Sequence, residues 1–165
     1  MSDLNVILAV GRDGFMARGS EDNMQWTGQT DKAIFKLLTS VGQIIGMSNR
    51  SADLLPPKGL PGRQVVRLSR TGYQLMDFAE NNPGAWLGGG YTLTKEALEL
   101  DLVRAVFVCH LDRDCCGPKG RAAYPGALED PTRLYLTGQG SVQRKWKLEN
   151  TAHLGDVAVA IHRRG

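Results

Sequence analysis

The sequence lacks the features of a membrane, exported or metal-binding protein. No apolar run reaches the roughly eighteen residues of a transmembrane helix, and no charged and then apolar leader follows Met1. There are only three cysteines, Cys109, Cys115 and Cys116. An odd number with two adjacent residues fits neither a disulfide framework nor the paired spacing of a zinc site, so no metal is expected. We therefore expect a protein of the reducing cytoplasm, without a membrane partner.

The chain also lacks a strong excess of charge. Its 20 basic and 17 acidic side chains give a net charge of +3. Basic residues are scattered except at 144–147 and at Arg163-Arg164, so nucleic acid is not an expected partner. A small anionic ligand remains possible, because a few local arginines can hold carboxylates or phosphates. A length of 165 residues indicates one domain with its own core, and we expect a monomer.

Apolar stretches alternate with helical patterns along the chain. Strands are predicted at 4–10, 43–46, 64–69, 85–87, 103–111, 134–136 and 157–161. Helices are predicted from Thr30, from Ser48-Asn49 to the prolines at 56–57, over 74–80 and over 91–100. Residues 15–25 and 112–125 are predicted loops, the first long enough to act as a lid. This order predicts an α/β fold with a mixed, mainly parallel sheet flanked by helices, its last strands antiparallel at one edge.

Asp31 is the polar residue that most needs an explanation. The segment from Met24 to Lys36 runs from an aromatic-bearing loop into a helix, with Asp31 on the apolar side and Phe35 one turn later. A carboxylate beside Phe35 and Trp26 would lose water, and desolvation raises its pKa toward values useful for proton transfer. Alternatively, Thr30 and Asp31 only cap the helix, because negative charge is favoured in any first turn.

Several predicted strand ends carry residues suited to phosphate binding. Gly88-Gly89-Gly90 joins a strand to a helix, where bare backbone and free N–H groups can approach a phosphate. Ser48-Asn49 and Ser69-Arg70 also follow apolar strands, on the side of a parallel sheet where ligands collect. Glycine clusters also form ordinary turns, and Arg70 can be a solvated surface residue, so both interpretations stay open.

Taken in order, these motifs resemble the dihydrofolate reductase family, which reduces 7,8-dihydrofolate with NADPH. The resemblance runs from Val6 to Pro125. It is carried by Ala9, Met16-Ala17, Met24-Gln25-Trp26, Asp31 with Phe35, residues 44–49, the intact Leu60-Pro61-Gly62-Arg63, Leu68-Ser69, and Leu87 with the three glycines. The implied fold is a single dihydrofolate reductase-like domain over residues 1–165. The implied activity is the NADPH-dependent formation of tetrahydrofolate, which supports one-carbon metabolism and thymidylate synthesis.

The resemblance also implies a role for each matched residue. Asp31 would bind the pterin and promote protonation of N5 while hydride passes to C6, with Trp26 holding an ordered water. Dihydrofolate would further contact Ile7, Lys32, Phe35, Leu60, Arg63, Leu87 and Cys109, with Arg63 pairing to its α-carboxylate. NADPH would be held by Ala9, Met16, Ala17, Ser48, Asn49, Ser69, Arg70, Gly88, Gly89, Gly90, Tyr91 and Thr92, with Ser69-Arg70 at its 2′-phosphate. The lid would close over the nicotinamide.

Six positions depart from the family pattern, the first two being Ala17 in place of a glycine and Gln25 in place of the proline before the tryptophan. Met47 replaces an arginine expected near the cofactor phosphates, and Leu93 replaces a tyrosine beyond the glycines. Cys109 replaces the threonine that usually hydrogen-bonds the catalytic carboxylate, and a thiol is a weaker donor. Lys32 replaces an apolar substrate contact, although its stem can still cover a ring.

Two other functions remain open at this point. The same fold serves the pyrimidine reductase of riboflavin synthesis, although Asp31 and the intact 60–63 segment favour a folate. A non-catalytic relative could instead keep the fold as a ligand-binding or scaffold module, and the substitutions at Met47, Leu93 and Cys109 are compatible with that.

Overall fold

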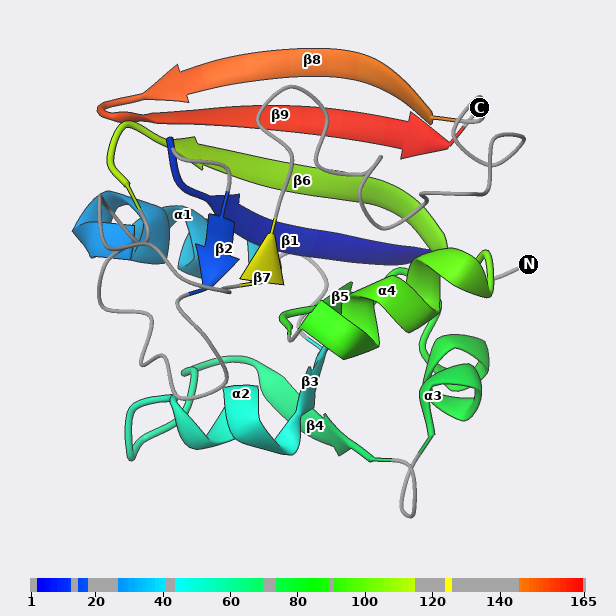
Figure 1. The fold of residues 1–165 in the computed structure, drawn as a ribbon. Coiled ribbons are helices and arrows are strands. Elements are labelled where there is room, and N and C mark those ends of the chain that lie inside the picture. The colour runs from blue at the N-terminus through cyan, green and yellow to red at the C-terminus, as the bar shows by residue number, and fades with distance from the viewer. Residues whose placement is uncertain are drawn as a thin grey trace.

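The computed structural model describes residues 3–12, 15–17, 27–40, 44–69, 74–89, 91–114, 124–125 and 146–164. Within these ranges one sheet has seven strands in the order β4-β3-β5-β1-β6-β9-β8 (Figure 1). They are β1 (Leu4–Val10), β3 (Ile44–Ser48), β4 (Gln64–Leu68), β5 (Trp86–Leu87), β6 (Val103–Leu111), β8 (Trp146–Leu154) and β9 (Val157–Arg164). A separate antiparallel pair joins β2 (Phe15–Ala17) to β7 (Tyr124–Pro125).

The sheet is parallel through its centre and antiparallel at one edge. β1 pairs in parallel with β5 and β6, and β3 pairs in parallel with β4 and β5. β9 runs antiparallel to β6, and β8 runs antiparallel to β9. The predicted mixed, mainly parallel sheet is therefore confirmed, and so is the antiparallel pairing of the last predicted strand, which is β9.

Helices cover both faces of the sheet. They are α1 (Gly28–Thr39), α2 (Asn49–Asp53), α3 (Leu75–Asn81) and α4 (Tyr91–Glu99). The even-numbered residues of β1, such as Val6, cluster with Phe78 of α3 and Leu98 of α4. Ile7 lies on the other face and clusters with Ile34 of α1. This alternation explains why β1 reads as a continuous apolar run, because both of its faces are buried.

Several parts of the chain differ from the sequence-based prediction, including α2, which ends at Asp53 and does not reach the prolines at 56–57. α1 begins at Gly28, earlier than the predicted Thr30, and Thr27 is its N-cap residue. Phe15–Ala17 and Tyr124–Pro125, both placed in predicted loops, pair as strands. β8 is absent from the prediction, because Lys147 to Leu154 are all exposed at the sheet edge and show no buried apolar face. The predicted strand at 134–136 lies outside the described residues.

No helix among the described residues is long and apolar enough to span a membrane. Nor does the described part of the chain bring three or more His, Cys, Asp or Glu side chains together in a way that could hold a metal ion.

The histidines of β6 and β9 predict a pH-dependent stability. Burial, with a smaller contribution from the charge of His162, lowers the pKa of His110 below its usual value of 6.5. The folded protein therefore resists protonation of His110 more than the unfolded chain does. The resulting stability is present above pH 6.5 and is lost as the pH falls from that value through the lower pKa of the folded state. We expect the urea midpoint to fall between about pH 8 and about pH 5.5 by more in the wild type than in His110→Gln. An equal fall in both proteins would contradict the prediction.

Candidate functional site

Several predicted cofactor residues lie at the carboxyl ends of parallel strands: Ser48-Asn49 at β3, Ser69 at β4 and Gly88-Gly89 at β5. β1, β3, β4, β5 and β6 run in one direction, so their carboxyl ends lie at the same edge of the sheet. The chain moves outward from β1 to β3 and β4, returns to place β5 between β3 and β1, and then crosses to β6. Such a reversal of strand order is where open α/β sheets bind ligands.

Asp31 lies on the flank of α1 that faces β6. Its carboxylate is half-buried and accepts side-chain hydrogen bonds from Cys109 of β6 and from Thr27 one helical turn earlier. Burial is the largest influence on its pKa and raises it, while the two donors and the charge of Lys32 act in the opposite direction. The predicted loss of water around Asp31 is confirmed. The capping alternative fails for Thr30, because the N-cap residue is Thr27.

Cys109 is the residue of β6 that hydrogen-bonds to Asp31. It is 1% exposed and is a free thiol. Burial, followed by the charge and hydrogen bond of Asp31, raises the pKa of this thiol far above its usual value. Cys109 therefore stays protonated at neutral pH and acts as a donor to the carboxylate, with no nucleophilic character.

The apolar cluster to which Cys109 belongs contains several predicted substrate contacts. Ile7 of β1, Leu60 and Cys109 are buried members of the cluster, and Ala9 and Phe35 pack against it. Leu87 differs, because its side chain is fully buried in the cluster on the opposite face, with α3 and α4. Leu87 can therefore offer only its backbone to a ligand on the α1 face.

Arg63 is fixed beside the last turns of α1. One terminal nitrogen donates to the Pro61 carbonyl at 3.0 Å, and the other donates to the Lys36 carbonyl. A guanidinium has five N–H groups, so both terminal nitrogens keep a further donor. These contacts hold the fork in one orientation, as recognition of a carboxylate by two parallel hydrogen bonds requires.

Two strand-to-helix junctions meet at the expected cofactor site. The backbone N–H of Ser48 donates to the Gly89 carbonyl at 3.0 Å, and the N–H of Gly88 donates to the Gly46 carbonyl at 2.9 Å. Ser48 also caps α2 by accepting from the N–H of Ser51 at 3.3 Å. The end of β5 is thereby tied to the start of α2. Asn49 is turned away toward β4, since both its carbonyl and its side-chain oxygen accept from Arg67.

Gly89 could not be replaced without strain. Its φ is +117°, and a Cβ atom there would lie 3.1 Å from the Ser51 hydroxyl oxygen. The absence of a side chain at Gly89 lets the end of β5 pack closely against Ser51 at the start of α2.

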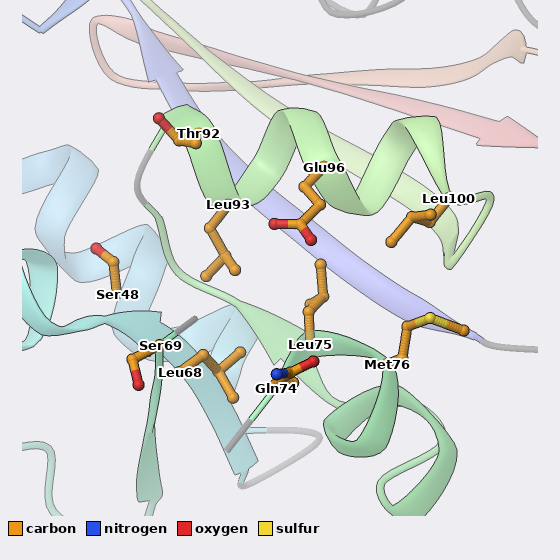
Figure 2. A pocket seen from close by; sticks show the side chains of 10 residues that line it. All are labelled: Ser48, Leu68, Ser69, Gln74, Leu75, Met76, Thr92, Leu93, Glu96 and Leu100. Atoms are coloured by element: carbon orange, nitrogen blue, oxygen red, sulfur yellow. The ribbon is translucent and has the colours of Figure 1, made fainter. Parts of the chain in front are cut away.

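A pocket of about 300 Å³ adjoins this junction (Figure 2). Leu93 and Glu96 of α4 face Leu68 and Leu75 across it. Three predicted cofactor residues, Ser48, Ser69 and Thr92, line the same pocket, together with Gln74, Met76 and Leu100. The structure thus brings together hydroxyl groups from the ends of β3 and β4 and from the first turn of α4.

Met47, which stands where the family pattern has an arginine, packs inside the protein. Its side chain is 3% exposed and belongs to the cluster on the α1 face. Its terminal methyl lies 2.6 Å from where a Cβ of Gly88 would be. Met47 is therefore a packing residue under the glycine junction, with no polar group to offer a phosphate.

Other predicted residues can be placed only in part. Trp26, Arg70 and Gly90 lie outside the described residues. Met16 and Ala17 belong to β2, and Tyr91 begins α4. Lys32 is half-buried on α1, next to Asp31.

Thr27 is the site residue that sequence reasoning missed. It precedes the predicted helix, and only the contact of its hydroxyl with Asp31 reveals a role. Its position four residues before an unusual carboxylate is the available indication, because such residues share one face once the helix extends far enough.

Comparison with known proteins does not assign a function, so any proposal has to be argued from the residues described above. No family model matches the chain, and no curated protein matches it closely enough to indicate a relative.

Proposed function

We propose that the chain is a dihydrofolate reductase that uses NADPH. The observation that carries the proposal is Asp31, a partly desolvated carboxylate held by Thr27 and by Cys109 of the neighbouring strand. It lies beside an apolar cluster that contains Ile7 and Phe35. A flat heterocycle with N–H donors fits such a carboxylate, and a raised pKa suits a group that delivers a proton near neutral pH.

The substrate's two ends would meet two different parts of α1. Asp31 would bind the pterin near the start of the helix and promote protonation of its N5. Arg63, tied to the Lys36 carbonyl, would receive the α-carboxylate of the glutamate tail near the end of the helix. Phe35 lies between these positions in the sequence of the helix and would pack on the rings.

The residues at the glycine junction fit a dinucleotide. Gly88 and Gly89 present backbone without side chains, and Ser48, Ser69 and Thr92 line the adjoining pocket with hydroxyl-bearing side chains. Bound there, NADPH supplies the hydride for the reduction. Arg70 is proposed to bind the 2′-phosphate, because Met47 cannot.

The direct test is the loss of NADPH absorbance on addition of dihydrofolate to the purified protein. We expect turnover that needs both compounds. Turnover only with the riboflavin-pathway pyrimidine, or binding of NADPH and dihydrofolate without turnover, would overturn the proposal in favour of the corresponding alternative.

Gly89→Ala should weaken NADPH binding. The substitution forces a side chain into a left-handed backbone conformation beside Ser51, at a cost on the order of 1 to 3 kcal/mol, and disturbs the backbone that the cofactor approaches. We expect the dissociation constant, measured by quenching of tryptophan fluorescence, to rise by about tenfold or more.

Gly84→Ala is the matched control. Gly84 also has a positive φ, of +82°, but a Cβ added there would meet nothing within 4 Å, and the residue precedes β5 at the other end of that strand. This variant should lose stability without losing NADPH affinity. Equal losses of affinity in both variants would remove Gly89 from the cofactor site.

A further inference from the structure

Thr27 occupies the N-cap position of α1 without capping the helix. An N-cap threonine usually has an extended backbone, and its hydroxyl accepts a hydrogen bond from an N–H in the first turn. Thr27 instead has φ −70° and ψ −25°, and its side chain makes no capping hydrogen bond. The residue is nevertheless only 4% exposed, so its hydroxyl requires a partner inside the protein.

That partner is the Asp31 carboxylate. Residues four apart in a helix lie on the same face, so the Thr27 hydroxyl can reach Asp31 along the axis of α1. Cys109 approaches the same carboxylate from β6. The carboxylate is thus held between a donor of its own helix and a donor of the sheet, and of the two a hydroxyl is intrinsically the better donor.

We propose that Thr27 is a positioning residue, whose hydroxyl fixes the Asp31 carboxylate on the flank of α1 that faces β6. The catalytic consequence of this role rests on the proposed function, whereas the contact between Thr27 and Asp31 does not depend on it. Donors to a carboxylate favour its ionised form and so oppose the effect of burial. Thr27 therefore helps to set the pH at which Asp31 holds its proton.

Other charged groups surround this contact. Lys32 is the neighbour of Asp31 on α1, and its charge acts in the same direction as the donors. The Arg113 guanidinium lies against Gly28 at the start of the helix and pairs with Asp156 at 2.9 Å. The thiol of Cys109 stays protonated. None of these groups is altered by a change at Thr27 that removes only its hydroxyl.

The test is a titration of Asp31 that does not depend on activity. Carbon-13 NMR follows the side-chain carboxyl carbon of Asp31, identified as the resonance that Asp31→Asn lacks. Thr27→Val replaces the hydroxyl by a methyl of similar size and should move the titration upward by about one pH unit, the equivalent of one lost hydrogen bond. Thr27→Ser keeps the hydroxyl and should restore the wild-type titration.

Thr39→Val is the matched control on the same helix. Thr39 is completely buried, and its hydroxyl donates to the Phe35 carbonyl at 2.7 Å, away from Asp31. Its loss should lower stability and leave the titration of Asp31 unchanged. If Thr27→Val loses its near-ultraviolet circular dichroism, Thr27→Ala provides the same measurement with a smaller side chain.

Two further outcomes separate this inference from the proposed function. If the wild type reduces dihydrofolate, the pH profile of its kcat/KM should shift in Thr27→Val in the same direction as the NMR titration. If it does not, a shift of the NMR titration still supports the Thr27 contact, and only the proposed function fails. Identical titration of Asp31 in the wild type and in a folded Thr27→Val would overturn the inference.

Discussion

Asp31→Asn is expected to lower the turnover of dihydrofolate by about 100- to 10,000-fold at neutral pH. The amide has nearly the shape of the carboxylate, its carbonyl oxygen can still accept from Cys109 and its NH2 group can donate to the Thr27 hydroxyl, so the fold and NADPH affinity should be retained. What it cannot do is carry a negative charge or promote protonation of N5. Stopped-flow measurement of hydride transfer, with saturating NADPH, checks the effect on the chemical step. Near-normal turnover would remove Asp31 from the proposed mechanism.

Asp31→Asn should also show how the buried carboxylate affects the stability of the folded protein. Burial raises the pKa of Asp31 in the folded protein, so the stability linked to its protonated form is present at low pH and is lost as the pH rises through the folded pKa. At neutral pH we therefore expect Asp31→Asn to melt at the same temperature as the wild type or higher. A lower melting temperature in the variant would mean that the contacts of the charged form outweigh its desolvation.

The central strands are the part of the fold that the sequence predicts best. β1 and β6 have the predicted limits, 4–10 and 103–111. Both are paired on two sides and buried on two faces, so nearly every position is apolar and the pattern is complete. β9 is also predicted but ends later than expected, because Arg163 and Arg164 continue the strand with charged side chains that pair with Glu149 and Asp101.

The edge strand β8 and the β2–β7 pair could not be predicted from local sequence patterns. In β8 the apolar residues Leu148, Ala152 and Leu154 recur at even positions, but Asn150 interrupts them and residues 147–154 are all exposed, so no buried apolar face marks the strand. The pairing of β2 with β7 is equally invisible to local patterns, since it joins two short segments that lie in predicted loops. Long-range backbone pairing, and not propensity, specifies these strands.

Sequence patterns predict the parts of the candidate site that one helix or one short motif supplies. Asp31 and Phe35 share a flank of α1 by spacing alone, and Arg63 is identified from its motif. The approach of Cys109 to Asp31 depends on where α1 packs over β6, which no local pattern contains. Thr27 is missed because a helix that begins at Thr30 leaves its hydroxyl in the preceding loop, whereas α1 begins at Gly28.

Arg63→Leu is expected to raise the KM for dihydrofolate by about 10- to 100-fold, because it removes charge-assisted hydrogen bonds to the α-carboxylate that contribute on the order of 1.5 to 3 kcal/mol. A pterin without the aminobenzoyl-glutamate tail never reaches the guanidinium, so its KM should hardly change. Steady-state kinetics with both substrates, at saturating NADPH, measure the difference.

Arg63→Leu should also affect stability, and the measurement must separate this effect from the loss of substrate binding. Arg63 also binds the carbonyls of Pro61 and Lys36, so its loss loosens the turn against α1 and should lower the stability. Arg164→Leu is the control, because Arg164 likewise donates to a backbone carbonyl, that of Asp101 at 3.0 Å, but at the far end of β9. It should lose stability with an unchanged KM. If Arg63→Leu raises the KM for both pterins alike, the arginine acts only through the position of α1, and the proposed grip on a glutamate carboxylate is wrong.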